Sequence, residues 1–348
     1  MEVMKEIHEP VLAVGAADII DGNDFLITQA KALDIKVYVL PSLVTRLSGA
    51  ADFAALHDLL SVIRLVRPQM LHLHSSKAGL LGRLAGQLTK TPTVFTAHGW
   101  AFTDGVSAMR KILAVITERL AARSTDRIIT VSHYDASLAV RWGVGNESQV
   151  VTIENGIPDL PLQVKTRREG RVRVVMTARF AVPKDQQELI HATALVPDLE
   201  LWLVGDGPRL MGARSVAHEL GISDRVRFLG NRSDVPEILA SADIFALISN
   251  YEGFPMSTLE AMRAGLPVIV SDVGGAGEAV MHGVTGFIVP KGNVAELVRV
   301  LRLLIDRPDR REAMGVAARA RFLAHYQLEG MVKRTFAVYD AVSAERST

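Results

Sequence analysis

Two cations five positions apart stand where a strand gives way to a helix. Arg179 and Lys184 follow the run Val172–Thr177, whose β-branched content is typical of a buried strand. The fork of a guanidinium and the point charge of an ammonium can converge on one diphosphate, and the N-terminus of the next helix would add positive potential. On spacing alone, two exposed loop charges explain the pair equally well.

Two carboxylates follow a later strand and could bind the hydroxyl groups of a sugar. Glu252 lies in a loop, and Glu260 lies in the next helix, eight positions further on. Gly253 and Pro255 shape a turn between them whose backbone N–H groups can reach an anion. A structural alternative competes here, because Ser257 and Glu260 have the spacing of a capping box, in which the glutamate only satisfies the backbone at the helix start. Taken by itself, this motif favours the cap.

Histidines end two strands in the first half of the chain. His98 follows Thr93–Ala97 at the edge of a predicted site, although a lone histidine more often serves as a structural hydrogen-bonding group. His72 and His74 alternate along another strand, and we expect them to point to opposite faces of the sheet, which argues against a shared metal ion. The sequence has no Walker loop, Asp-x-Asp pair or Ser–His–Asp order, so it predicts anion binding with polar contacts and no metal.

Three glycine-rich loops adjoin strands in the second half of the chain, at Gly205–Pro208, Gly274–Glu278 and Gly283–Gly286. Glycine permits close approach of the backbone to a ligand, but each loop is also explained as a tight turn. The second loop lacks the spacing of the dinucleotide fingerprint, so a nicotinamide site has little support.

The composition excludes several classes of protein. Of 348 residues, 49% are apolar and 22% charged, with 39 Lys and Arg against 38 Asp and Glu. The chain is therefore globular and lacks the cationic excess of a general nucleic-acid-binding protein. Its lack of cysteine excludes disulfides, thiol catalysis and Cys-ligated zinc. No run approaches the ~18–20 apolar residues of a membrane span, and Glu2, Glu6 and Glu9 disfavour a signal peptide, so we expect a cytoplasmic protein.

Short β-branched runs alternate with helical patterns along the chain, which predicts two α/β domains with doubly wound parallel sheets. The periodicity lapses between Asn155 and Gly170, and we expect domains at 1–164 and 165–327, followed by a helix in 328–348 that crosses back to the first domain. Ligands of such sheets bind beyond the carboxyl ends of the strands, so the site is expected in a cleft between the domains. The predicted strands are Val11–Gly15, Lys36–Leu40, Met70–His74, Thr93–Ala97, Arg127–Val131, Gln149–Ile153, Val172–Thr177, Leu199–Val204, Arg225–Leu229, Asp243–Ile248, Pro267–Val270 and Gly286–Val289. The predicted helices are Asp52–Val66, Gly79–Leu88, Ala108–Ala122, Tyr134–Trp142, Asp185–Leu195, Arg209–Leu220, Val235–Ala240, Ser257–Ala264, Ala276–Met281, Val294–Ile305, Arg310–His325 and Leu328–Val342.

In this order, these segments resemble the retaining glycosyltransferase family 4, which has the GT-B fold of two Rossmann-like domains facing each other across a cleft. The resemblance extends from about residue 10 to the C-terminus. Its most specific part is the Arg179/Lys184 pair together with Glu252 and Glu260. The segments that carry it are 72–83, 96–99, 118–120, 128–132, 155–157, 179–184, 204–208, 228–230, 252–262 and 283–290.

The resemblance implies that the second domain binds a nucleotide diphosphate sugar, with UDP favoured. Arg179 and Lys184 would bind the diphosphate, and Glu260 would hold the ribose. The base would lie against Gly230, Asn231 and Arg232. The donor sugar and distal phosphate would contact Glu252, Gly253, Phe254, Pro255 and Met256.

The resemblance also implies a mechanism without a metal ion or other cofactor. His98 would lie beside the transferred sugar and the acceptor. Fixed cations would stabilise the negative charge on the departing diphosphate. The acceptor would attack from the leaving-group face, so the sugar would retain its anomeric configuration without an enzymatic nucleophile.

The resemblance implies a polysaccharide or lipid-linked saccharide as acceptor, because the segment from His74 to Lys77 is frequent in relatives that build bacterial polysaccharides on lipid diphosphates. Basic residues flank the apolar helix predicted at 108–122, and they could contact anionic lipid at the inner face of the cytoplasmic membrane. A solvated helix face is the ordinary alternative. These residues are Arg110, Lys111, Arg119, Arg123 and Arg127.

The start of the chain departs from the family pattern. Relatives have an apolar strand, a glycine-containing loop and a helix before the segment that matches Val11–Gly15, and Met1–Glu9 resembles only the end of that helix. We therefore expect the opening strand to be missing. Because neighbouring strands lie ~4.8 Å apart, its absence would leave a gap of roughly 10 Å with unpaired backbone on both sides.

Two other functions fit the same residues. A non-catalytic protein could bind a nucleotide sugar in the second domain without presenting an acceptor, and it would show donor binding without turnover. A nucleotide-sugar epimerase on the same fold would release a free sugar isomer without consuming an acceptor. Both alternatives remain open at the level of sequence.

Overall fold

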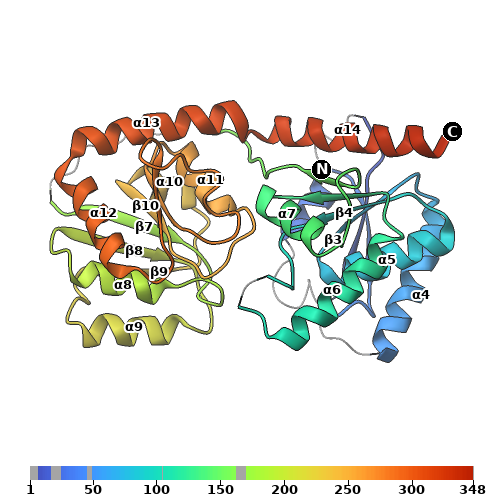
Figure 1. The fold of residues 1–348 in the computed structure, drawn as a ribbon, viewed down its shortest axis with the longest axis horizontal. Coiled ribbons are helices and arrows are strands. Elements are labelled where there is room, and N and C mark those ends of the chain that lie inside the picture. The colour runs from blue at the N-terminus through green and yellow to red at the C-terminus, as the bar shows by residue number, and fades with distance from the viewer. Residues whose placement is uncertain (1–6, 17–24, 45–48, 104, 162–169, 348) are drawn as a thin grey trace. The chain divides into compact units, whose positions relative to one another are not determined.

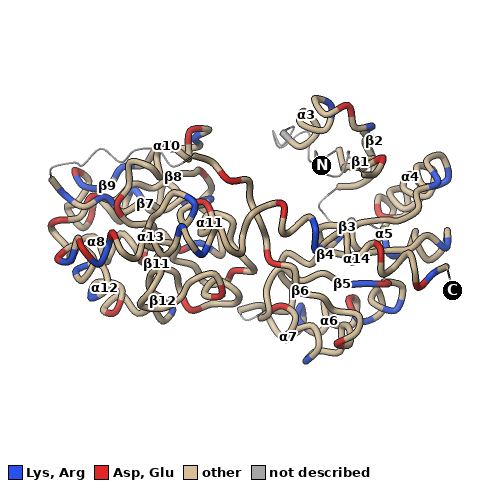
Figure 2. Tube along the Cα trace, turned by 90° about the horizontal axis from the view of Figure 1, so that it is seen from above, with Lys and Arg blue, Asp and Glu red and all other residues tan. Residues whose placement is uncertain are grey.

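The computed structural model describes residues 7–16, 25–44, 49–103, 105–161 and 170–347. The chain divides into two compact units (Figure 1). Unit 1 contains residues 1–131, 135–153 and 332–348, and unit 2 contains residues 132–134 and 154–331. Cationic residues (Lys and Arg) and anionic residues (Asp and Glu) are interspersed along both units (Figure 2), in keeping with the nearly equal numbers of the two kinds.

Unit 2 is built on one parallel sheet of six strands in the order β12-β11-β10-β7-β8-β9. Strand β7 is the first along the chain and lies in the middle of the sheet. The next strands, β8 and β9, follow on one side of it, and β10, β11 and β12 follow on the other, so the strand order reverses between β7 and β10. This is the doubly wound arrangement. The four residues of β10 and of β11 are all buried. The strands are β7 (Val172–Thr177), β8 (Leu199–Val204), β9 (Val226–Gly230), β10 (Ile244–Leu247), β11 (Val268–Ser271) and β12 (Gly286–Val289).

Helices surround this sheet. Helix α12 has an apolar stripe of five buried residues that faces the core, as expected for a helix that packs on a sheet. The helices of unit 2 are α8 (Gln186–Ala194), α9 (Leu210–Glu219), α10 (Val235–Ala240), α11 (Met256–Arg263), α12 (Val294–Asp306) and α13 (Pro308–His325). Helix α14 (Leu328–Ser347) begins in unit 2 and continues in unit 1.

Unit 1 contains two separate parallel sheets. Strands β1 (Val11–Gly15) and β2 (Lys36–Leu40) pair only with each other, whereas the other sheet has the order β3-β4-β5-β6. Its strands are β3 (Leu71–His74), β4 (Thr93–Ala97), β5 (Arg127–Thr130) and β6 (Val150–Thr152). The helices are α3 (Phe25–Ala32), α4 (Gly49–Val66), α5 (Ser76–Thr89), α6 (Ala108–Ala122) and α7 (His133–Arg141), the first two residues of which belong to unit 2.

Within the described residues, no strand pairs with β1 on its second side or with β3 on the side away from β4. The absence of an opening strand before Val11–Gly15 stays a prediction. The part of the prediction that concerns residues 1–6 lies outside the described residues. Tyr339 of α14 contacts His8, which precedes β1, and His72 of β3. Its ring centroid lies 6.3 Å from that of His8, and its hydroxyl group lies 2.5 Å from Nδ1 of His72.

The predicted helix at Ala276–Met281 is wrong. The segment forms successive turns, in which the N–H of Ala276 donates to the carbonyl of Val273 and the N–H of Val280 donates to that of Gly277. Helix α3 was not predicted. None of the described helices combines the length and the apolar content that crossing a bilayer requires.

Candidate functional site

The predicted donor-site residues follow two adjacent strands of unit 2. Strand β7 leads into Arg179 and Lys184, and β10 leads into the loop with Glu252. These strands pair with each other, with Ile244 opposite Val174, and the strand order reverses between them. Ligands of doubly wound sheets bind outside the carboxyl ends of the strands at this switch point. The sheet topology therefore brings the two sequence motifs to one place.

Lys184 and Glu252 form an ion pair although they are 68 positions apart in sequence. The carboxylate also accepts a hydrogen bond from Oγ of Ser249 at 2.5 Å, and the backbone N–H of Ser249 donates to Oγ of Ser271 at 3.0 Å. Glu252 is only 7% exposed, so its charge depends on these partners. The sequence analysis did not identify either serine. Their positions at the carboxyl ends of β10 and β11, where ligands of such sheets bind, could have indicated them.

Arg179 is exposed, and within the described part of the chain its guanidinium makes no hydrogen bond or ion pair with another residue. Its backbone is held firmly. The adjacent Phe180 donates its N–H to the carbonyl of Asp206 and accepts a hydrogen bond from the N–H of Arg209, both at 2.9 Å. A Cβ at Gly205 would lie 2.2 Å from the carbonyl oxygen of Ala178. The first glycine loop thus positions a cation that remains available to an anion.

The second glycine loop packs directly on the backbone of Glu252. The N–H of Gly275 donates to the carbonyl of Glu252 at 3.0 Å. Gly274 has φ +52°, and a Cβ there would lie 2.1 Å from the same carbonyl oxygen. Both the positive φ and the close approach require glycine. From the sequence, this loop is explained either by close approach of the backbone to a ligand or by a tight turn, and its role in placing Glu252 comes only from the tertiary structure.

The turn after Glu252 presents unpaired backbone donors. Among the residues that the structure describes, the N–H groups of Gly253, Phe254 and Met256 donate no hydrogen bond. Gly253, Phe254 and Pro255 are buried, whereas Met256 is exposed. Because buried N–H groups are rarely left unpaired, these donors are suited to bind a ligand oxygen.

Glu260 does not serve as a helix cap, so the interpretation that the motif by itself favoured is wrong. Helix α11 begins at Met256 with Pro255 at the N-cap and without a side-chain cap, which places Ser257 inside the first turn. The carboxyl group of Glu260 is half-buried, and within the described residues it accepts no hydrogen bond. Burial raises its pKa, and Arg263 offsets part of that effect. A desolvated carboxylate without a donor is suited to bind hydroxyl groups.

The stretch predicted to frame the base ends strand β9. Gly230 has φ +67° and accepts a hydrogen bond from the N–H of Gly205 at 2.8 Å. Asn231 and Arg232 follow and are exposed. The guanidinium of Arg232 makes a bidentate pair with Asp234, at 2.7 and 2.6 Å. Its charge is thus already balanced, unlike that of Arg179.

His98 of unit 1 belongs to a cluster of three imidazoles. Its Nε2 lies 3.0 Å from Nδ1 of His74, and the ring centroids of His72 and His74 are 4.3 Å apart. The prediction that His72 and His74 point to opposite faces is therefore wrong, because residues two apart on a strand share a face. Nε2 of His72 also lies 2.7 Å from the hydroxyl group of Thr96. The cluster holds His98 at the carboxyl end of β4.

Burial and the neighbouring imidazoles depress the pKa values of this cluster. Desolvation, followed by His74 and His98, lowers the pKa of His72 well below its usual value. Desolvation and His98 lower the pKa of His74 to about 4, and desolvation lowers the pKa of His98. The exposed edges of His74 and His98 let water screen part of this effect. All three rings are neutral at neutral pH.

Unit 1 should lose stability as the pH falls from neutral toward about 5. Because the folded pKa of His74 is below its unfolded value, the unfolded state binds more protons in this window, and stability falls with falling pH. We expect His74→Gln to flatten the dependence by a few degrees in the unfolding temperature, at about 2–4 °C per kcal/mol. The unfolding temperature of the variant and of the unaltered chain, measured across this pH range, tests the prediction. An equal flattening by His57→Gln, an exposed histidine on α4, would contradict it.

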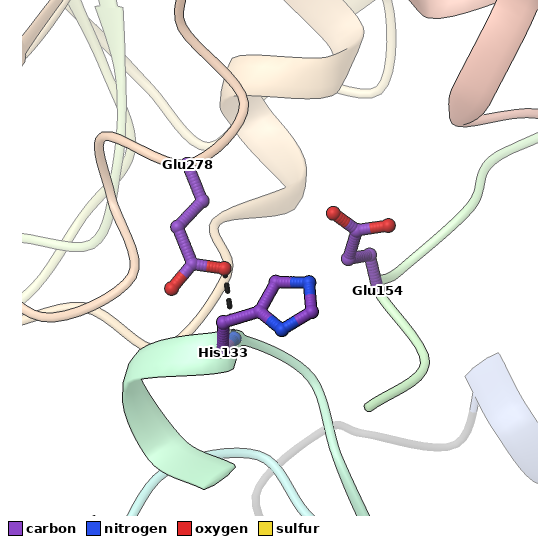
Figure 3. Close-up of side chains that lie close together, drawn as sticks. All are labelled: His133, Glu154 and Glu278. Carbon is purple, nitrogen blue, oxygen red and sulfur yellow. Dashed lines mark hydrogen bonds between the residues drawn. The ribbon is translucent and has the colours of Figure 1, made fainter. Parts of the chain in front are cut away.

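One group in the described residues has the ligand types and spacing of a metal site. Nitrogen or carboxylate oxygen atoms of His133, Glu154 and Glu278 lie within 4.8 Å of one another (Figure 3). Both carboxylate oxygens of Glu278 already accept hydrogen bonds, from the N–H of His133 at 2.8 Å and from that of Tyr134 at 2.7 Å. These two hydrogen bonds make Glu278 a cap on the first turn of α7, which accounts for its position without a metal ion.

Two family models match the chain. The model described as glycosyl transferases group 1 matches residues 162–321, and the model described as glycosyl transferase 4-like domain matches residues 17–156. Together they span most of both units.

Individual proteins of known activity or structure are also similar. The UDP-Gal:alpha-D-GlcNAc-diphosphoundecaprenol alpha-1,3-galactosyltransferase of Escherichia coli is 27% identical over 291 residues, 78% of this chain and 75% of that protein. The crystal structure of Anabaena HepE with UDP-glucose superposes with a TM-score of 0.78 at 20% identity, covering 96% of this chain and 100% of that one. Sucrose-phosphate synthase from Thermosynechococcus elongatus has a TM-score of 0.79 at 20% identity, covering 96% and 99%. At this identity the two structures establish the fold.

Proposed function

Because the chain belongs to the retaining glycosyltransferases of family 4, with two Rossmann-like domains in the GT-B fold, we propose that it transfers a sugar from a UDP-sugar to a saccharide acceptor. The observation that carries this proposal is the contact between Lys184 and Glu252 at the switch point of unit 2. Solved structures of the same fold contain UDP or UDP-glucose, which supports the choice of donor.

The charges at the switch point suit the reaction. Arg179 and Lys184 bind the two phosphates, and the unpaired N–H groups after Glu252 bind the distal phosphate. As the bond from the anomeric carbon to the diphosphate breaks, negative charge grows on the leaving oxygen, and the fixed cations stabilise it. The acceptor oxygen forms the new bond on the same face, and its proton leaves with the diphosphate.

The remaining residues orient the donor. Glu260 accepts hydrogen bonds from the ribose hydroxyl groups, and Gly230, Asn231 and Arg232 adjoin the base. Glu252, with Gly253 to Met256, holds the transferred sugar. His98 is proposed to contact that sugar and the acceptor through a neutral imidazole whose orientation His74 maintains.

We propose a division of labour along the chain. Residues 1–164 present the acceptor, residues 165–327 bind the donor, and residues 328–348 form the helix that crosses back. The E. coli relative is named for a GlcNAc-diphosphoundecaprenol substrate, which supports a lipid-linked saccharide acceptor here. Such an acceptor implies work at the inner face of the cytoplasmic membrane through peripheral contact.

A thermal-shift screen over nucleotide diphosphate sugars tests the donor. Binding to the folded state raises the unfolding temperature by mass action, and UDP-sugars should give the largest shifts. Glu260→Gln should weaken binding by about 10- to 100-fold, since it removes a charged acceptor worth ~1.5–3 kcal/mol. It should not destabilise the fold at neutral pH: the raised pKa means that the carboxylate is less favourable folded than unfolded.

Glu188→Gln is the matched control, because Glu188 is also half-buried with a pKa raised by desolvation and by Asp185. It should not weaken donor binding, because it removes a negative charge from the first turn of α8. If Glu260→Gln lowered stability and kept full affinity, Glu260 would be structural and its role in the site would be disproved.

A further inference from the structure

Helix α6 of unit 1 turns its apolar side outward. Its buried residues are Val115, Ala121 and Ala122, two of which are small. On the opposite side, large apolar residues recur at intervals of three or four positions, which places them in one stripe. They are Met109, Ile112, Leu113, Ile116 and Leu120, exposed by 82, 58, 64, 49 and 57%. Surface helices ordinarily direct such a stripe at the core, so α6 is reversed.

The neighbouring helix also exposes apolar side chains. Helix α5 packs beside α6 (Figure 1) and exposes Leu84 by 41% and Leu88 by 60%. Single exposed apolar residues are ordinary on protein surfaces. A continuous stripe along a helix of 15 residues is different, since large apolar patches mark interaction surfaces.

The charged residues around the stripe are cationic. The one acidic residue of α6, Glu118, points inward and pairs with the buried Arg83 at 2.8 Å. Arg110, Arg119 and Arg123 are exposed. Of the cations named from the sequence, Arg127 is unavailable, because it pairs with Glu345. An exposed apolar stripe flanked by cations is the pattern of a helix that lies in a membrane interface and attracts anionic lipid.

We propose that the outward side of α6, from Met109 to Leu120, is a membrane-binding surface that inserts its apolar side chains among the headgroups of an anionic bilayer. The contact is peripheral, since no described helix is suited to cross a membrane. This inference rests on the proposed function in one respect: a lipid-linked acceptor lies in the same membrane. The donor site in unit 2 does not depend on it.

Vesicle co-sedimentation tests the surface. The full chain should bind vesicles of phosphatidylcholine mixed with phosphatidylglycerol, bind phosphatidylcholine alone more weakly, and lose the difference at high salt. The triple variant Ile112→Ser, Leu113→Ser, Ile116→Ser should bind the mixed vesicles at least ~10-fold more weakly, because burial of apolar area drives insertion. Met211→Ser, Val316→Ser, Leu323→Ser is the matched control, since it changes exposed apolar residues on helices of unit 2 and should bind as the unaltered chain does.

UDP binding and unfolding temperature of each variant separate this test from that of the donor site. Intact UDP binding with lost vesicle binding supports the surface. Absence of vesicle binding by the unaltered chain, or equal binding by both triple variants, would overturn it. So would a dimer in solution that the α6 variant dissociates, because the stripe would then be an interface between copies.

Discussion

Replacing both Arg179 and Lys184 by alanine is expected to lower UDP affinity by about 10²- to 10⁴-fold. Each charge-assisted hydrogen bond to a phosphate contributes ~1.5–3 kcal/mol, and tenfold in affinity corresponds to about 1.4 kcal/mol. The two residues follow β7 at the switch point, where the phosphates are proposed to lie. Titration calorimetry with UDP measures the loss, and the steady-state rate with a UDP-sugar should fall with it.

Lys184 also balances the charge of Glu252, so its removal leaves a nearly buried carboxylate without a cation and should lower stability. The single variant Arg179→Ala avoids this complication and should lose about 10- to 100-fold in affinity at unchanged unfolding temperature. Arg171→Ala with Arg299→Ala removes the same total charge from exposed ion pairs of unit 2 and should bind UDP normally. Normal UDP binding by the Arg179/Lys184 variant would refute the assigned phosphate site.

Gly274→Ala is expected to lower the turnover rate by about 100-fold, because displacement of a positioning group by ~1 Å can have an effect of this size. An alanine at φ +52° is strained, and its Cβ would lie 2.1 Å from the carbonyl oxygen of Glu252. The backbone that carries Glu252 must therefore move. Steady-state rates with a UDP-sugar and the unfolding temperature would both report the change.

Gly283→Ala separates strain from displacement. Gly283 has φ +79°, but a Cβ there meets nothing within 4 Å. The Gly283→Ala variant should lose a similar ~1–2 kcal/mol of stability through backbone strain, and its turnover rate should be unchanged. The role of the loop in placing Glu252 would be wrong if the two alanine variants had the same rate.

The sequence alone determined the local elements and the residues at their ends. Strands of unit 2 such as Val172–Thr177 and Leu199–Val204 occur as predicted, because short, mostly apolar runs that alternate with helical patterns are typical of strands in a parallel sheet. Their ends then placed Arg179 and Lys184 at the start of a helix. The resemblance to glycosyltransferases, carried by the same segments, identified the family.

Only the tertiary structure decided which side chains meet. The contact of Lys184 with Glu252, and the packing of Gly274 on Glu252, depend on the order of strands in the sheet, which local periodicity does not encode. The capping motif at Ser257 does not act as a cap, because α11 begins at Met256 and its N-cap is Pro255, two residues before Ser257. Periodicity likewise predicted helix α6. The apolar stripe in its sequence shows that the two sides of the helix differ, but it does not show which side is buried. Packing against the rest of unit 1 determined that this side faces outward.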